Sequence, residues 1–240
     1  MDKYRIKEDY FDLLCSSPVN KNIDCLQIIT HMDEVGIDKS VVFGFAFRDM
    51  RLCQMANNYT IKMVNRYPER LLGLAVVNPI SETVTEELSR CKEAGLLGVG
   101  ELFPTGQGFD ITRAKQLEPL CQFCSDNDWP LLIHLNEPVG HHYKGKTEDS
   151  IKEGAILAEN FPEVTFIFAH MGGGLCFYEL MPELKKSLKN VYYDTAALPF
   201  LYNNKIIESL KAAGLSKKII FGSDFPLISP AKYIEIIDST

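Results

Sequence analysis

The chain has 240 residues, of which 46% are hydrophobic and 24% charged, as in a globular protein large enough to bury a full core. Its net charge is −7 and it has no block of basic residues, which argues against nucleic acid as a partner, because phosphate binding depends on clustered Lys and Arg. No stretch resembles the apolar core of a signal peptide or the roughly 20 apolar residues of a membrane span, so we expect no membrane association.

The cysteines indicate a reducing compartment. Their number, seven, is odd and their positions are scattered, so we expect free thiols and a cytoplasmic location. Cys121 and Cys124 form a CxxC pair inside a predicted helix, with no second pair to complete a zinc site. We interpret them as two apolar residues on one helix face rather than as zinc ligands.

Seven short segments rich in Val, Ile, Leu and Phe are predicted to be buried strands. In chain order they are SVVFGFAF (40–47), LLGLAVVNP (71–79), LLGVGELFP (96–104), PLLIHLNEP (130–138), VTFIFAHMG (164–172), VYYDTAAL (191–198) and KIIFGSDFP (218–226). Helical patterns fill the intervals, among them 25–38, 53–68 and 81–95, and a polar helical pattern, KEDYFDLLCSS, precedes them all.

This regular alternation predicts parallel strands covered by helices, in a single domain over residues 1–240. The strand starts lie 25 to 34 residues apart, which favours a (β/α)8 TIM barrel that is incomplete, with seven strands recognisable. A doubly wound open sheet is the alternative. It usually carries a glycine-rich phosphate loop after its first strand, and this sequence has none there.

Polar residues end the predicted strands, at the edge where a parallel barrel carries its chemistry. They are Arg48, Asn78, Glu101, His134, His170, Asp194 and Asp224. Imidazole and carboxylate groups are ligands that Zn²⁺, Mn²⁺ and Fe²⁺ accept. A single histidine at a strand end is more often an ordinary core residue, and Asp194 could equally serve a turn. Two histidines at matching strand positions favour a metal site of His134, His170, Asp224 and Glu101.

The segments LLIHLNEP, FIFAHMGG and IIFGSDFP resemble the amidohydrolase superfamily, and YPERLLGLAVVNP resembles its amidohydrolase-related branch of TIM-barrel metal-dependent hydrolases. The similarity covers most of residues 24–228. It implies that His134 and Asp224 bind a divalent metal, with zinc favoured, and that His170 is the sixth-strand histidine. Glu101 resembles a fourth-strand glutamate of TatD-type deoxyribonucleases, which helps to hold a second metal. The branch contains hydrolases and non-oxidative decarboxylases.

The family's first strand carries a His-x-His pair that this sequence lacks. Three explanations stay open: a first strand encoded upstream of Met1, a non-catalytic barrel that acts as a binding module, or a reduced site built from the four candidate ligands. We favour the first, because the other strand ends keep their ligand residues. A barrel with an incomplete wall would also gain from association with a second copy.

The leading hypothesis is a metal-dependent hydrolase of a small anionic substrate. Asp224 would move the proton of a metal-activated water, and His170 would bind the metal or polarise the substrate. Decarboxylation of an aromatic or unsaturated acid at the same site is the alternative. Candidate substrate-binding groups on the rim loops, some of which surface charge explains equally well, are Arg48, His141, His142, Lys144 and the backbone N–H groups at Gly172.

Overall fold

Seven short parallel strands form the centre of the computed structural model, which describes residues 8–16, 21–140 and 142–238. They are β1 (Ser40–Val42), β2 (Leu71–Gly73), β3 (Val99–Leu102), β4 (Leu131–Ile133), β5 (Phe166–Phe168), β6 (Val191–Asp194) and β7 (Ile219–Ile220). Strands β3 to β7 form one sheet in chain order, and β1 pairs with β2 in a second. A bridge between Ala75 and Val99 connects the two sheets.

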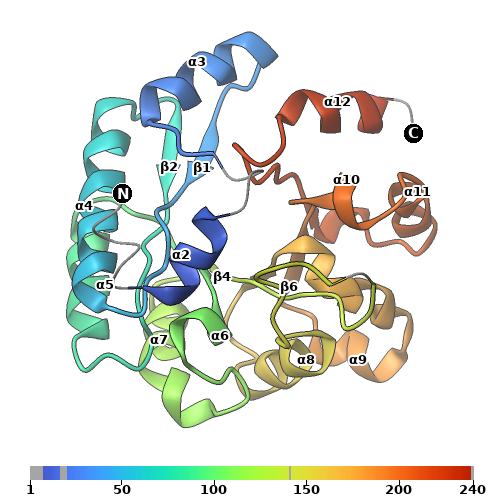
Figure 1. Cartoon of the computed structure of the whole chain (residues 1–240). Helices are drawn as coiled ribbons and strands as arrows, with labels where there is room; N and C mark the ends of the chain where they lie inside the picture. Colours follow the sequence, from blue (N-terminus) through green and yellow to red (C-terminus); the bar gives the residue numbers. More distant parts are fainter. Residues whose placement is uncertain (1–7, 17–20, 141, 239–240) are drawn as a thin grey trace.

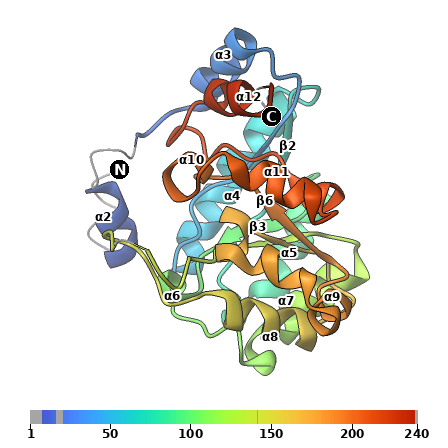
Figure 2. The same ribbon diagram turned by 90° about the vertical axis from the view of Figure 1, so that its right-hand side faces the viewer.

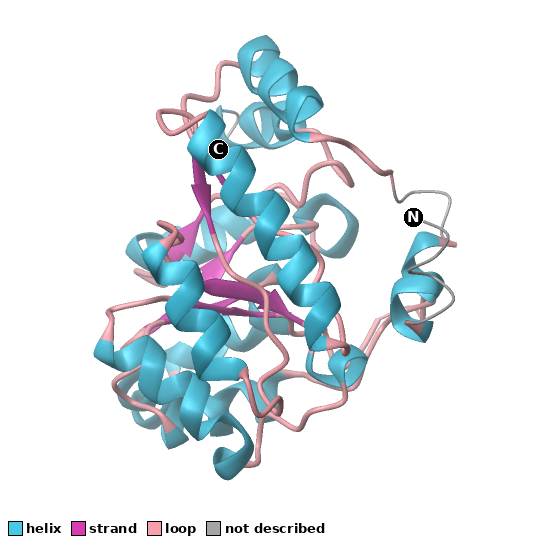
Figure 3. Ribbon diagram, turned by 90° about the vertical axis from the view of Figure 1, so that its left-hand side faces the viewer, coloured by secondary structure: helices cyan, strands magenta, loops and turns pink. Residues whose placement is uncertain are grey.

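Helices lie between successive strands and surround the sheets (Figures 1 and 3). The longer ones are α3 (Cys25–Val35), α4 (Met50–Arg66), α5 (Val84–Glu93), α7 (Ala114–Asp126), α8 (Ile151–Asn160), α11 (Lys205–Ala212) and α12 (Pro230–Asp238). The shorter ones are α2 (Asp9–Cys15), α6 (Pro104–Gln107), α9 (Pro182–Ser187), α10 (Leu198–Leu201) and the 3₁₀ segments η1 (His170–Leu180) and η2 (Ser216–Lys218). No helix in the described ranges has the length and apolar character that a membrane crossing requires.

Local sequence explains where these helices begin and end. The Asp24 side chain accepts the backbone N–H of Gln27, whose own side chain accepts the N–H of Asp24, so a capping box starts α3. Gly36 ends α3 with a φ of 75°, a conformation that glycine adopts without strain. Helix α4 stops just before Pro68, which has no N–H to continue it.

The core fills the space between strands and helices. Leu131, Ile133 and Phe168 are completely buried on neighbouring strands. Cys121 and Cys124 are each 1% exposed on the inner face of α7, and burial raises the pKa of the Cys124 thiol to about 12, so it stays protonated at neutral pH. Both thiols therefore behave as apolar core residues, as predicted.

The predicted alternation of parallel strands and helices is confirmed, and so is the number of strands recognised. The hydrogen-bonded strands are shorter than the predicted apolar segments, because the chain stays buried after strand pairing ends. For example, Val76 and Val77 follow β2 and are fully buried. Within the described residues β1 pairs only with β2, and β7 only with β6, so the wall is not closed by hydrogen bonds between these two strands.

Side chains tie neighbouring loops together at the carboxyl end of the strands. Gln107, which is fully buried, donates from its Nε2 to the carbonyl oxygens of Phe47 (3.0 Å) and Val77 (2.9 Å). Asn78 donates from its Nδ2 to the carbonyl oxygen of Arg48 at 2.8 Å. The loops after β1, β2 and β3 are therefore held as one unit.

Candidate metal centre

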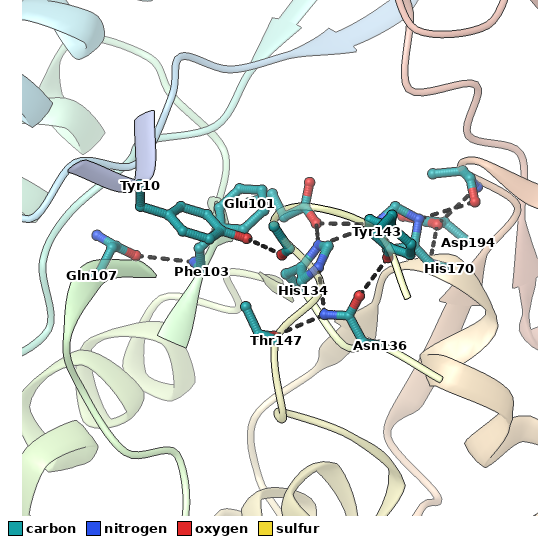
Figure 4. Close-up of polar contacts among 12 residues, drawn as sticks. Tyr10, Glu101, Phe103, Gln107, His134, Asn136, Tyr143, Thr147, His170 and Asp194 are labelled. Carbon is teal, nitrogen blue, oxygen red and sulfur yellow. Dashed lines mark hydrogen bonds and ion pairs between the residues drawn. The ribbon is translucent and has the colours of Figure 1, made fainter. Parts of the chain in front are cut away.

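Three side chains from successive strands converge at this end of the sheet (Figure 4). Glu101 lies in β3, His134 directly follows β4, and His170 begins η1 two residues after β5. His134 Nδ1 lies 2.9 Å from Glu101 Oε1 and 3.1 Å from His170 Nε2, and Glu101 Oε1 lies 3.6 Å from His170 Nε2. Their ligand atoms all lie within 4.8 Å of one another, and no other such group of His, Cys, Asp and Glu occurs in the described part of the chain.

The charges of this cluster compensate one another. Burial raises the pKa of Glu101, but hydrogen bonds from His134 and His170 outweigh it and lower the pKa overall, so the carboxyl is ionised. Burial lowers the pKa of His170, but the bond to Glu101 outweighs it and favours the protonated ring. Two imidazole nitrogens and one carboxylate oxygen are also ligand atoms that a divalent metal binds. A bound metal ion would replace the protons that these atoms share in the hydrogen bonds. The three residues therefore fit a metal ion.

A hydrogen-bond network holds His134 from behind. Its Nε2 lies 2.9 Å from the Nδ2 of Asn136, which also donates to Thr147 Oγ1 at 2.8 Å. The hydroxyl of Tyr143 donates to Asn136 Oδ1 at 2.7 Å. Because this contact occupies Nε2, the ring turns its Nδ1 toward the cluster (Figure 4). Such partners of a metal-binding histidine fix its orientation, and sequence reasoning did not identify Asn136 in this role.

His170 is oriented by the next strand. Its backbone N–H donates to Asp194 Oδ1 at 2.9 Å, and its Nδ1 donates to the carbonyl oxygen of Ala196 at 3.0 Å. Asp194 Oδ1 also accepts the N–H of Ala196 at 3.0 Å, which is the turn role considered as an alternative for this residue. Burial raises the pKa of Asp194 to about 6. Nε2 of His170 is thereby left facing the cluster.

Asp224 lies outside the three-residue group and is exposed to solvent, on the loop after β7. Partial loss of hydration raises the pKa of its carboxyl, and the charges of His170 and Glu101 act on it in opposite directions. Beside it, Thr195 Oγ1 donates to the carbonyl oxygen of Gly222 at 2.7 Å and connects the loops after β6 and β7. Asp224 thus lies within electrostatic reach of the cluster, and its predicted role as a ligand stays a prediction.

Helix α2 packs on the loops that follow β3 and β4 (Figure 2). Tyr10 donates to the carbonyl oxygen of Gly145 at 2.8 Å, and its ring lies 5.9 Å from that of Phe103. Phe103 in turn stacks on the ring of His134, with centroids 4.6 Å apart. The α2 sequence predicts a helix but carries no signal for its docking position, so sequence reasoning missed Tyr10.

The predicted substrate-binding side chains that the structure describes are exposed on loops. Arg48 is exposed, and its Nη2 donates to the carbonyl oxygen of Gly106 at 3.4 Å. His142 and Lys144 are exposed on the loop after β4. His141 lies outside the described residues. Binding of substrate by these residues stays a prediction.

The glycine segment after His170 is a left-handed turn rather than the start of an α-helix. Residues 170–174 all have positive φ, between 57° and 97°. The N–H of Gly172 donates to the carbonyl oxygen of Ala169 at 2.9 Å, and the use of backbone N–H groups here to hold an anion stays a prediction. Gly173 packs against the backbone of Asn136, where a Cβ would lie 2.2 Å from the carbonyl oxygen. The glycines allow a close contact between the loops after β4 and β5.

Comparison with known proteins identifies a family and solved structures of similar fold. The amidohydrolase family model matches residues 33–239. Similar solved structures include a 5-carboxyvanillate decarboxylase from Novosphingobium aromaticivorans complexed with manganese and 4-hydroxy-3-methoxy-5-nitrobenzoic acid. It is 17% identical with a TM-score of 0.71, over 92% of this chain and 74% of that one. A manganese-bound dihydroxybenzoic acid decarboxylase from Polaromonas sp. JS666 is 18% identical with a TM-score of 0.69, over 90% and 80% of the two chains.

A third similar structure is a probable 2-pyrone-4,6-dicarboxylic acid hydrolase from Acinetobacter baumannii with citric acid bound. It is 18% identical with a TM-score of 0.63, over 93% of this chain and 84% of that one. At such identities the likeness establishes the fold, and the prediction of a TIM-barrel type of α/β fold is confirmed.

Proposed function

The chain belongs to the amidohydrolase family, and from this premise we propose that it is a metal-dependent hydrolase of a small organic anion. Family membership identifies it as an enzyme, whereas the reaction and substrate are part of the proposal. The observation that carries the proposal is the buried convergence of Glu101, His134 and His170, whose donor atoms lie within 4.8 Å of one another. Three protein ligands that leave a coordination position open are typical of catalytic metal sites.

In this proposal His134 Nδ1, His170 Nε2 and the Glu101 carboxylate hold the ion. A bound divalent ion would supply Lewis acidity, which polarises a substrate oxygen and brings the pKa of a water toward neutrality, to about 7 in favourable zinc sites. The donor set suits zinc, as the sequence favours, and equally manganese, which is present in two of the similar structures.

The chain's own residues would then move protons and exclude water. Asp224, exposed beside the cluster, would accept a proton from the attacking water and deliver it to the leaving group. Asn136 and the carbonyl of Ala196 keep the two imidazoles aimed at the cluster. Phe103 covers one face of the His134 ring and keeps that side of the site dry.

Non-oxidative decarboxylation is the second candidate, and the two manganese-bound decarboxylases of similar fold favour it. In that reaction the bond between the carboxylate carbon and the adjacent carbon of the substrate breaks. Carbon dioxide leaves, and the electron pair stays on the substrate carbon. A proton from Asp224 would take the vacated place. The same residues serve both reactions, so only the products distinguish them.

Metal titration and product analysis test the proposal. We expect one zinc or manganese ion per chain by calorimetry, a loss of affinity of at least about tenfold in Glu101→Gln and His134→Ala, and no change in the exposed-histidine control His142→Ala. Screening esters, lactones and amides against carboxylated phenols then separates hydrolysis from release of carbon dioxide. A chain that binds no metal and converts no compound would instead support the non-catalytic binding module.

A further inference from the structure

A cavity of about 410 Å³ lies close to the loop after β7. Ile23, His31, Phe200 and Phe225 contribute to its walls, and Lys21 and Lys232 also line it. We call it the Lys232 pocket. Its volume falls within the range of small-molecule sites, roughly 300–1,000 Å³. Sequence reasoning assigned no role to these residues.

One aromatic wall of the Lys232 pocket is held in place before any ligand binds. The rings of His31 and Phe225 stack with centroids 4.4 Å apart and planes only 9° from parallel. His31 is anchored in turn, with Nε2 2.9 Å from Ser229 Oγ and Nδ1 3.2 Å from Glu34 Oε2. A flat ligand placed against this wall would lose little binding energy to ordering of the protein.

The charge of the Lys232 pocket is opposite to that of the whole chain. Lys21 and Lys232, both exposed to solvent, line it, although the net charge of the protein is −7. In the described part of the chain neither ammonium makes an ion pair or hydrogen bond to a protein group. Two cations without a partner among the described residues, beside apolar and aromatic walls, match a ligand that has an apolar body and an anionic group.

The Lys232 pocket also adjoins the catalytic end of the barrel. Phe225 directly follows Asp224, the proposed proton carrier. Phe200 lies on α10, four residues after Ala196, whose carbonyl oxygen orients His170. Figure 2 shows α10 and α12 on the same side of the molecule as α3. The loops after β6 and β7 therefore shape both the metal cluster and this pocket.

We propose that the Lys232 pocket binds a flat, aromatic organic acid through an anionic group that pairs with Lys21 and Lys232. The substrate would then be a molecule with two ends, one held by this pocket and the other presented to Asp224. The assignment of the bound acid as substrate rests on the proposed function, whereas its binding does not. The pocket would thus select substrates with a second acidic group remote from the reacting bond.

Binding of terephthalate, a flat dicarboxylate, to the full chain tests this inference by ligand-observed NMR and calorimetry. Lys21→Met combined with Lys232→Met should weaken binding by about tenfold or more, because both charges are lost while the apolar stems remain. Lys152→Met, a control that removes an exposed lysine from α8, should leave the affinity within twofold. Phe200→Ala should also weaken binding, and neutral 1,4-benzenedimethanol should not respond to the lysine changes.

Two outcomes would overturn the inference. The first is equal affinity in the double lysine variant and the wild type, with both shown to be folded by their thermal unfolding. The second is loss of terephthalate binding in His134→Ala alone, which would place the acid on the metal cluster. Retained binding in His134→Ala supports the inference even if no hydrolysis or decarboxylation is found, so the two proposals can fail separately.

Discussion

Replacing Gly173 with alanine should weaken the junction between the loops that carry His134 and His170. A Cβ at this position would lie 2.2 Å from the carbonyl oxygen and 2.6 Å from the carbonyl carbon of Asn136. Ordinary contacts of a Cβ begin near 3.4 Å, so one of the two backbones would have to move by more than about 1 Å. Asn136 is the residue that bonds Nε2 of His134, so the movement would reach the candidate metal centre.

Two costs add at Gly173. Its φ of 60° is left-handed, which costs a residue with a side chain about 1–2 kcal/mol. Overpacking against a buried backbone costs about 1–3 kcal/mol more. The free energy of unfolding should therefore fall by about 2–5 kcal/mol in Gly173→Ala. Gly214 offers a matched control, because its φ is 73° and a Cβ there would meet nothing within 4 Å. Gly214→Ala should lose only about 1–2 kcal/mol.

Urea unfolding of the two variants and the wild type measures this difference, and calorimetric metal titration shows whether the disturbance reaches the cluster. We expect Gly173→Ala to unfold at clearly lower urea than Gly214→Ala and to bind metal more weakly. Equal destabilisation of the two variants would refute the argument that contact with Asn136, and not backbone conformation alone, requires glycine at position 173.

Three further changes test other contacts. Burial raises the pKa of Glu87, but hydrogen bonds led by that from Arg90 outweigh it and lower the pKa overall. The carboxylate therefore stabilises the fold above its unfolded pKa of about 4.3, and this stability is lost as the pH falls through the folded pKa. In urea unfolding, Glu87→Gln should thus have a lower free energy of unfolding than the wild type at pH 7, and this difference should become smaller at pH 3. A difference that does not change with pH would contradict this. Asn136→Ala should weaken metal affinity about 10- to 100-fold in calorimetry, and unchanged affinity would exclude its positioning role. Tyr10→Phe should cost about 0.5–1.5 kcal/mol in chemical denaturation, because the bond to Gly145 is lost, and a neutral result would show that α2 docks without it.

The convergence of Glu101, His134 and His170 could be predicted from the sequence for a simple geometric reason. Each follows or ends an apolar run, and parallel neighbouring strands bring their carboxyl ends to the same edge. Strand lengths were harder to predict, because apolar composition reports burial and not hydrogen-bonded pairing. The structure accordingly pairs two to four residues in each strand and buries many more.

Other parts of the site depend on contacts between residues far apart along the chain, which sequence patterns do not reveal. Tyr10 and Gly145 are 135 positions apart, and His31 and Ser229 are 198 apart. The sequence shows three glycines shortly after His170, but glycine permits both a helix start and a left-handed turn, and only the surrounding packing decides between them. The single-domain organisation, the cytoplasmic location and the association of copies stay predictions.

The bonds between neighbouring loops have a practical consequence for engineering. Gln107 and Asn78 donate to carbonyls of preceding loops, and Thr195 donates to the loop that follows it. A foreign loop grafted into this rim would lack the matching partners and leave an amide or hydroxyl of its neighbour buried and unsatisfied, at about 1–3 kcal/mol each. Redesign of this scaffold should therefore exchange adjacent loops in pairs, or keep the loops and change single side chains within them.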